Sequence, residues 1–236
     1  MADNHGHKTN MDYLFGLINR TSLLAETSMS LEVTMYLSKI LISGPPYRNP
    51  YEIHRSLWRL FPEDADKDRD FLFRVGQGDR NHAEILLQSK RQPTRSSSST
   101  QILATKKYSL ALSPGDKLRF FLLANPIKTI SDESGRKKKD GEVKKCRVPL
   151  IREDDQRAWI ERKFHKVASF EILVIDSTFS LRFKKSKEDR IGKIQPVIFQ
   201  GILNVEEPDL LAELVETGIG PAKAFGCGLV SLSRRI

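Results

Sequence analysis

Cysteine is scarce in this sequence, whose 236 residues include only Cys146 and Cys227. Two thiols cannot build a disulfide scaffold, and they cannot supply four cysteine ligands to a zinc ion within one chain. Long apolar runs are missing as well. The longest, such as Phe170–Ile175, have the length of a strand, whereas a membrane helix needs roughly 18 apolar residues. We therefore expect no membrane association.

A secretory signal is also missing, because the N-terminus lacks a basic segment followed by an apolar one. Together with the low cysteine content, this favours a cytoplasmic protein from a reducing compartment. Residues 1–34 hold scattered polar residues, a weakly amphipathic stretch and the pair His5 and His7, which could bind a metal ion. We favour a flexible N-terminal extension over a metal site for this segment.

Acidic side chains are in the minority, with 30 Asp and Glu against 39 Lys and Arg, for a net charge of +9. The first 34 residues hold two basic and four acidic side chains, so the remainder carries +11. Any single basic group could be a solvated loop, but three groups favour a surface that binds a polyanion, most simply nucleic acid. The three groups are Lys90, Arg91 and Arg95; Arg136–Lys139, Lys144, Lys145 and Arg147; and Arg182, Lys184, Lys185, Lys187, Arg190 and Lys193.

The first half of the chain predicts the order β-α-β-β-loop-β. Its helix has clear start signals, because Asn49 suits the N-cap, Pro50 the first helical position and Glu52 the third. The helix should run to about Phe61 and stop at Pro62. Strands are expected at Met35–Ile42, Phe71–Val75, Glu84–Gln88 and Lys107–Leu112.

The second half repeats this order. Two βαββαβ units in tandem predict an α+β fold of two ferredoxin-like (RRM-like) domains, at residues 35–113 and 114–236. Nucleic acid often lies across such a sheet, although the fold alone does not determine the function. The expected strands are Leu118–Ala124, Phe170–Ile175, Ile194–Val205 and Gly228–Leu232, and the expected helices are Asp154–His165 and Pro208–Glu216.

One face of the first helix combines side chains suited to RNA chemistry. At about 100° per residue, Tyr51, His54, Arg55 and Trp58 form a face beside the apolar stripe that includes Leu57. A histidine on such a shoulder is more often structural, but histidine also gives and takes a proton near pH 7. RNA self-cleavage needs proton transfer at the 2′-OH and the leaving 5′-oxygen, with a cation near the phosphate.

The segment Gly218–Gly228 contains four glycines and Lys223. It does not match a dinucleotide fingerprint, because a helix precedes the glycines and a strand follows them, and its spacing misses the Walker A pattern. Glycines let backbone N–H groups approach a phosphate closely, and Lys223 adds a charge. The alternative is a tight connection between a helix and a strand.

Five segments that follow one another in order resemble the CasE family, the CRISPR repeat endoribonucleases of type I-E systems. The resemblance extends from Met35 to about Ser233, and residues 1–34 have no counterpart in it. It implies two tandem ferredoxin-like domains, a site without a metal or cofactor, and cleavage of precursor CRISPR RNA at each repeat hairpin to leave a 2′,3′-cyclic phosphate. The segments are Tyr51–Phe61, Leu122–Lys128, Lys145–Ile151, Gly192–Gln195 and Gly218–Lys223.

The resemblance also implies roles for individual residues. The family's catalytic histidine matches His54, its active-site tyrosine matches Tyr51, and its active-site lysine is best matched by Lys193. The expected partners are the repeat hairpin and other Cascade subunits, with the free enzyme a monomer. The expected RNA contacts are Arg55, Lys128, Arg182, Lys184, Lys185, Lys187, Gly218, Gly220, Lys223, Gly226 and Gly228.

Two other functions remain open from the residues alone. A non-catalytic subunit that only holds an RNA hairpin would not need the pair of Tyr51 and His54. A DNA-binding regulator would predict salt-sensitive binding to duplex DNA, but the sequence lacks a helix-turn-helix pattern. We therefore favour an endoribonuclease.

Overall fold

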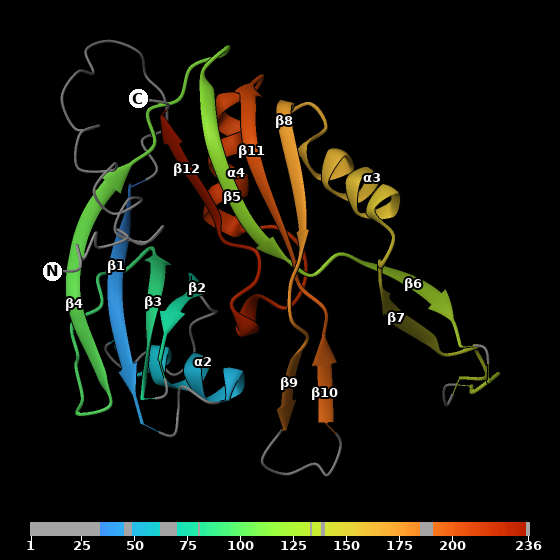
Figure 1. The fold of residues 1–236 in the computed structure, drawn as a ribbon, viewed down its shortest axis with the longest axis horizontal. Helices are drawn as coiled ribbons and strands as arrows, with labels where there is room; N and C mark the ends of the chain where they lie inside the picture. The colour runs from blue at the N-terminus through green and yellow to red at the C-terminus, as the bar shows by residue number, and fades with distance from the viewer. Residues whose placement is uncertain are drawn as a thin grey trace, which may run out of the picture.

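The structure is a computed structural model that describes residues 34–44, 49–61, 70–79, 81–132, 134–137, 140–184 and 191–234. Two four-stranded antiparallel sheets dominate it, with helices packed on them (Figure 1). None of the helices in these ranges is long and apolar enough to cross a membrane. The predicted extension at residues 1–34 lies outside the described residues except for Thr34, which begins the first strand.

The first sheet has the strand order β2-β3-β1-β4, with all neighbours antiparallel. This is the order of a ferredoxin-like unit, in which the first and third strands lie side by side at the centre. The predicted β-α-β-β-loop-β order is confirmed. The elements are β1 (Thr34–Ser43), α2 (Pro50–Trp58), β2 (Phe71–Gly78), β3 (His82–Ser89) and β4 (Thr100–Ser109).

The second sheet repeats this topology, with the order β12-β5-β11-β8 and antiparallel neighbours throughout. The predicted α+β fold of two tandem ferredoxin-like units is therefore confirmed. The boundary at residues 113 and 114 stays a prediction; β4 ends at Ser109 and β5 begins at Lys117. The elements are β5 (Lys117–Ala124), α3 (Glu153–Phe164), β8 (Ala168–Ser177), β11 (Val197–Val205), α4 (Pro208–Thr217) and β12 (Val230–Arg234).

Two hairpins and a short 3-10 helix extend beyond this repeated topology. Each hairpin is a separate two-stranded sheet, formed by segments that were predicted to be basic loops or strand ends. The expectation of one strand over Ile194–Val205 is wrong, because Gln195 and Pro196 are not in strand conformation and separate two strands. The added elements are β6 (Ile127–Ser131), β7 (Lys145–Pro149), β9 (Leu181–Lys184), β10 (Ile191–Ile194) and η2 (Lys223–Phe225).

The strand expected at Lys107–Leu112 is also shifted. β4 begins at Thr100 and ends at Ser109, because it follows β1 in register as far as the pair Thr34 and Ser109. The loop between β3 and β4 covers residues 90–99. It closes in a tight turn, in which the Ser97 N–H donates to the Thr100 carbonyl at 2.8 Å.

The part of the first sheet around β3 is buried on both faces, whereas the edge strand β4 is largely exposed. One face packs on α2, where Ile53 and Leu57 meet Phe71 and Phe73. The other face packs on the second half of the chain through a cluster of Leu37, Leu72, Leu86 and Leu229. Strand alternation accounts for this arrangement, since neighbouring residues of β2 point to opposite faces.

Polar contacts reinforce the joint between the two halves. The buried Arg74 guanidinium donates to the Ser231 hydroxyl at 2.9 Å and lies 4.4 Å from the centre of the Phe121 ring. The buried Gln88 side chain donates to the Val215 carbonyl at 2.7 Å. The two sheets are thus held in one fixed arrangement, and the glycine-rich segment lies at their joint.

Candidate functional site

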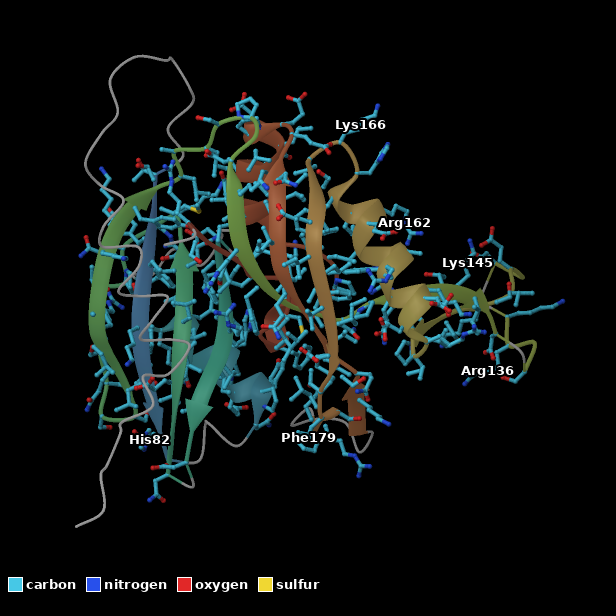
Figure 2. All side chains as sticks on the ribbon, turned by 45° about the horizontal axis from the view of Figure 1, so that its top comes forward. His82, Arg136, Lys145, Arg162, Lys166 and Phe179 are labelled. Carbon is cyan, nitrogen blue, oxygen red and sulfur yellow. The ribbon has the colours of Figure 1, made fainter. Side chains whose placement is uncertain are left out.

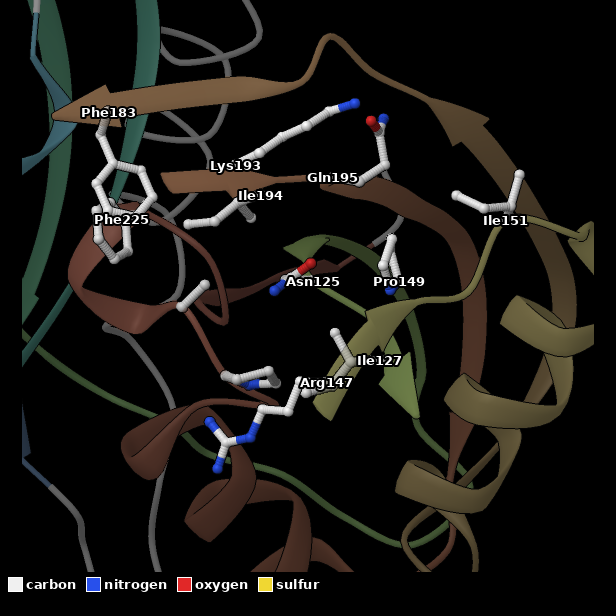
Figure 3. A pocket seen from close by; sticks show the side chains of 12 residues that line it. Asn125, Ile127, Arg147, Pro149, Ile151, Phe183, Lys193, Ile194, Gln195 and Phe225 are labelled. Atoms are coloured by element: carbon white, nitrogen blue, oxygen red, sulfur yellow. The ribbon is translucent and has the colours of Figure 1, made fainter. Parts of the chain in front are cut away.

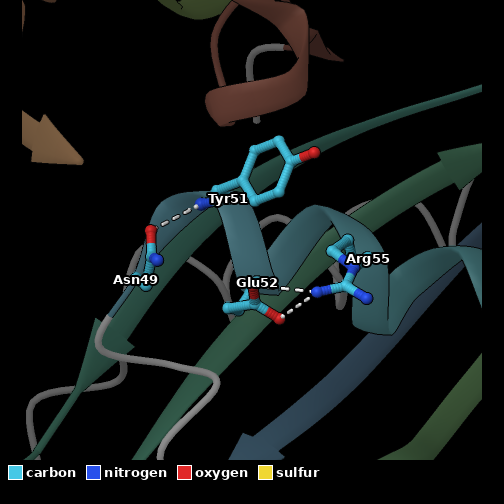
Figure 4. A network of polar contacts seen from close by, with 4 residues as sticks. All are labelled: Asn49, Tyr51, Glu52 and Arg55. Carbon is cyan, nitrogen blue, oxygen red and sulfur yellow. Dashed lines mark hydrogen bonds and ion pairs between the residues drawn. The ribbon is translucent and has the colours of Figure 1, made fainter. Parts of the chain in front are cut away.

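The start of α2 is anchored directly before Tyr51. The Asn49 side chain accepts a hydrogen bond from the Tyr51 N–H at 3.1 Å, as the predicted N-cap requires, and Pro50 takes the first helical position (Figure 4). One turn on, the Arg55 guanidinium donates to both oxygens of Glu52, at 3.1 and 3.2 Å. The cap thereby sets where in the first helical turn the Tyr51 side chain projects.

His54 lies on the predicted shoulder between core and surface, and three aromatic rings hold it. The Trp58 ring meets it edge-on with centroids 6.2 Å apart, and the Phe71 and Phe73 rings lie 5.6 and 6.3 Å away. The Nε2 atom is buried. In this ring orientation Nε2 is therefore shielded from solvent.

The 3-10 helix η2 and strand β9 both lie against α2. Tyr51 projects from α2 on the side where η2 lies (Figure 4). These contacts bring together segments that are about 130 to 170 residues apart in the chain. A surface formed by α2, η2 and β9 therefore carries the face with Tyr51 and His54.

An aromatic pair attaches the β9–β10 hairpin to η2. The Phe183 ring of β9 and the Phe225 ring of η2 have centroids only 4.2 Å apart. Phe183 also covers its cross-strand partner Gly192 so closely that a Cβ atom at this glycine would overlap the ring. The hairpin that carries Lys193 is thus held by the same 3-10 helix that packs on α2.

Lys193 and Arg182 are direct cross-strand partners in this hairpin. Both side chains are exposed. Like charges in such positions repel each other, and among the described residues neither forms an ion pair with a carboxylate. An anion bound between them would relieve the repulsion, so the hairpin suits a phosphate. Tyr51 and His54 share one helix, while Lys193 lies one strand beyond β9, which contacts that helix.

The four glycines of the segment Gly218–Gly228 have positive φ angles of 75°, 77°, 84° and 94°. Each also approaches a neighbour closely. A Cβ atom at Gly218 would lie 2.7 Å from a Leu72 methyl group, and one at Gly226 would lie 3.3 Å from the Phe73 ring. The close approach predicted for a phosphate is here made to the protein itself. A tight connection therefore accounts for the glycines, and RNA contact by Gly218, Gly220, Gly226 and Gly228 stays a prediction.

Lys223 also serves this connection. Its ammonium donates to the Thr217 carbonyl at 2.7 Å, at the C-terminal end of α4. A cation is favourable there, because the last carbonyls of a helix lack intrahelical partners. The predicted RNA contact of Lys223 would have to be made in addition to this hydrogen bond.

The three basic groups differ in whether their charges are paired with carboxylates of the protein. In the first group, Lys90 pairs with Glu216, and the Arg91 guanidinium donates to Asp70 at 2.5 and 3.0 Å. These charges are neutralised within the protein. The described members of the second group lie on the β6–β7 hairpin, which projects from the body of the molecule and carries Arg136 and Lys145 (Figure 2).

The remaining predicted RNA contacts are spread over several elements. Arg55 is exposed and paired with Glu52, and Lys128 is exposed on β6. Lys184 ends β9, whereas Lys185 and Lys187 lie outside the described residues. The described part of the chain contains no cluster of three or more His, Cys, Asp or Glu side chains that could hold a metal ion.

A pocket of about 450 Å³ lies between the base of the β6–β7 hairpin, the β10–β11 junction and the glycine-rich segment (Figure 3). Phe183 and Phe225 form one wall, and Lys193 lies at the rim. Two further lining residues are Arg147, which belongs to the second basic group, and Asn125, which was not predicted as a site residue. Both residues fall within the segments that resemble the CasE family, which is the signal that could have identified Asn125.

Comparison with known proteins identifies the family. A family model described as CRISPR associated protein matches residues 35–234. The chain belongs to this family. The match begins within one residue of the predicted end of the N-terminal extension, and it includes both sheets.

Two relatives in this family are similar over nearly their whole length. The Cascade subunit CasE of Escherichia coli K12 is 44% identical over 202 residues, which are 84% of this chain and 99% of the relative. A crystal structure of Cas6e from the same organism matches with a TM-score of 0.74 at 41% identity, over 85% of this chain and 100% of that one.

The second relative is the CRISPR-associated endoribonuclease Cse3 of Thermus thermophilus. It is 29% identical over 223 residues, which are 84% of this chain and 100% of the relative. A structure of Thermus thermophilus Cse3 bound to an RNA that represents a pre-cleavage complex matches with a TM-score of 0.66 at 26% identity. That match covers 85% of this chain and 99% of the other. The resemblance to the CasE family is confirmed.

Proposed function

We propose that this protein is an endoribonuclease that cleaves precursor CRISPR RNA within each repeat hairpin and stays bound to the product as a Cascade subunit. The observation that carries the proposal is the packing of η2 on both α2 and the β9–β10 hairpin. This packing links the helix face of Tyr51 and His54 to the hairpin that carries Arg182 and Lys193. The two relatives support it through their names, Cascade subunit CasE and endoribonuclease Cse3. We further propose that it acts in the cytoplasm, as a monomer before assembly.

The proposed reaction is an internal transesterification that needs no metal ion. The 2′-oxygen forms a bond to the adjacent phosphorus as its proton is removed, and the bond from phosphorus to the 5′-oxygen breaks as that oxygen gains a proton. The products are a 2′,3′-cyclic phosphate and a 5′-OH. No net oxidation or hydrolysis occurs, so proton transfer and charge stabilisation suffice.

We assign the proton transfer to His54, whose ring is oriented by its three aromatic neighbours. Tyr51, one turn earlier on the same helix, positions the reacting phosphate. Lys193 stabilises the negative charge that develops on the phosphoryl oxygens. Arg182, its cross-strand partner, is suited to a neighbouring phosphate of the stem.

The test incubates the protein with its own CRISPR repeat RNA in the presence of EDTA. Wild type should cleave once per repeat, whereas His54→Ala should bind the RNA and cleave it at least a hundredfold more slowly. The matched control is His82→Ala, because His82 lies on the β2–β3 hairpin and its Nδ1 faces Asp79 at 3.1 Å. Equal cleavage by His54→Ala and wild type would refute the assignment.

A substrate with a 2′-deoxyribose before the scissile phosphate distinguishes the proposal from mere RNA binding. This RNA lacks the nucleophile, so it should bind normally and remain intact. If wild type binds the repeat hairpin but leaves the all-ribose substrate intact as well, the protein is the non-catalytic hairpin-binding subunit instead.

A further inference from the structure

The 450 Å³ pocket beside Lys193 has a composition unlike that of an ordinary surface depression. Its lining includes two cations, Arg147 and Lys193, and no carboxylate. Its walls are largely apolar, with Ile127, Pro149 and Phe225 among them. Its volume lies in the range of small-molecule sites. Apolar walls with cations at the mouth suit a flat ring system that carries a phosphate.

Asn125 supplies a polar group inside the pocket. Its side chain is half-buried and projects into the pocket from the end of β5, opposite Ile194 (Figure 3). A carboxamide offers two donors and one acceptor, the combination that reads the edge of a nucleobase. Within the described part of the chain, the Asn125 side chain forms no hydrogen bond that would use these groups.

Gln195 has a different role at the rim. Its amide donates to the Thr178 carbonyl at 2.9 Å and accepts from the Ser180 hydroxyl at 2.6 Å. Both ends of the side chain are therefore engaged in bracing the loop between β8 and β9. The rim is held in shape by these bonds, so the pocket is formed before any ligand enters.

The position of the pocket relates it to the proposed active site. Phe183 and Phe225 form the wall nearest α2, because β9 and η2 are the elements that lie against this helix. Lys193 stands at the rim, on the opposite side of β10 from Ile194 (Figure 3). An RNA strand with one phosphate bound to Lys193 would therefore place a neighbouring nucleotide at the mouth of the pocket.

We propose that this pocket binds one unpaired nucleotide that adjoins the base of the hairpin stem. A paired base cannot enter, because a base must leave its stack to reach into a pocket, and proteins read RNA sequence mainly at such splayed bases. Asn125 contacts the base edge, the apolar walls contact the ring, and Arg147 contacts the phosphate. The inference rests on the proposed function, since it takes the repeat hairpin as the ligand.

The experiment measures the dissociation constants of four RNAs that carry a 2′-deoxyribose at the cleavage position. The first three are the bare stem-loop, the stem-loop with one added 5′ nucleotide and the stem-loop with one added 3′ nucleotide. The fourth is whichever extended stem-loop binds more tightly, with its added nucleotide replaced by an abasic one. One of the two extensions should tighten binding about tenfold over the bare stem-loop, and removal of the base should abolish the gain.

Two protein variants locate this gain in the pocket. Asn125→Ala removes the amide, and Ile127→Trp fills the cavity. Each should reduce the affinity for the extended RNA to that for the bare stem-loop and leave the latter within twofold. The matched control is Val143→Trp, because Val143 is exposed outside the pocket lining and lies in the connection between β6 and β7.

The outcomes separate the two proposals. If the protein does not bind the bare stem-loop, the proposed function fails. If it binds the stem-loop but neither extension adds affinity, or if Ile127→Trp weakens bare and extended RNA equally, only the nucleotide pocket is refuted. An abasic nucleotide that binds as well as the intact one would likewise refute base recognition.

Discussion

Replacing Gly218 by alanine should destabilise the protein much more than the same change at Gly115. Both glycines have a positive φ, 75° and 84°, and an L-residue in the left-handed region costs about 1–2 kcal/mol. The ψ of 163° at Gly218 lies outside that region, in a conformation essentially restricted to glycine, so its backbone cost is at least as large. Their surroundings differ. A Cβ at Gly115 would have no neighbour within 4 Å, whereas one at Gly218 would lie 2.7 Å from a Leu72 methyl group and 2.8 Å from the Gly228 carbonyl oxygen.

The clash at Gly218 adds to the backbone cost. Leu72 belongs to the cluster that joins the two halves, and the Gly228 carbonyl is backbone that can move only with β12. Overpacking of this kind costs about 1–3 kcal/mol. We therefore expect a loss of about 2–5 kcal/mol for Gly218→Ala and about 1–2 kcal/mol for Gly115→Ala. For a protein of this size, 1 kcal/mol lowers the melting temperature by about 2–4 °C.

Thermal and urea unfolding of the two variants beside wild type measure this difference. Equal unfolding midpoints for Gly218→Ala and Gly115→Ala would refute the packing argument. A second measurement, the affinity for the repeat hairpin well below the melting temperature, distinguishes packing from phosphate contact. If Gly218→Ala keeps wild-type stability but loses RNA affinity, its glycine serves the ligand and not the joint.

Three further predictions concern the joint and the hairpins. At pH 8 the native protein should expose one reactive thiol per chain, that of Cys146, because Cys227 is fully buried and burial raises the pKa of its thiol to about 12. In denaturant both thiols should react. Two fast-reacting thiols in the native protein would contradict the burial of Cys227. Burial lowers the pKa of Arg74 to about 10, a cost of about 3 kcal/mol at every pH below that value, which its hydrogen bond and ring contact roughly offset. Arg74→Met should therefore stay within about 1 kcal/mol of wild-type stability in urea unfolding, and a loss above about 3 kcal/mol would show that the charge itself stabilises the joint. Phe183→Ala removes an aromatic pair worth about 0.5–1.5 kcal/mol and should slow single-turnover cleavage about two- to tenfold, while Phe183→Leu, which still covers the strand partner, should lose less; equal rates for the two would refute the bracing role.

Local sequence patterns predict most of the helices and strands. The N-cap at Asn49 and Pro50 was predicted because capping depends on residues within one turn, and the structure has the same bond. The helix face of Tyr51, His54 and Trp58 follows from helical periodicity alone. The order β-α-β-β-loop-β in the first half and β-α-β-β-α-β in the second follows from apolar alternation and turn residues, and the two sheets have the same strand order.

Tertiary contacts decided what lies beside that helix face. The β9–β10 hairpin, the Phe183–Phe225 pair and the pocket around Asn125 join residues that are distant in the chain, and no local pattern marks such contacts. The glycines of Gly218–Gly228 show most clearly what cannot be predicted from the sequence. The sequence by itself determined that Gly218–Gly228 allows a close approach of the backbone. Only the packing of Leu72, Phe73 and Trp159 against these glycines decided that the protein itself makes this approach, because positive φ angles and missing Cβ atoms let two sheets meet there.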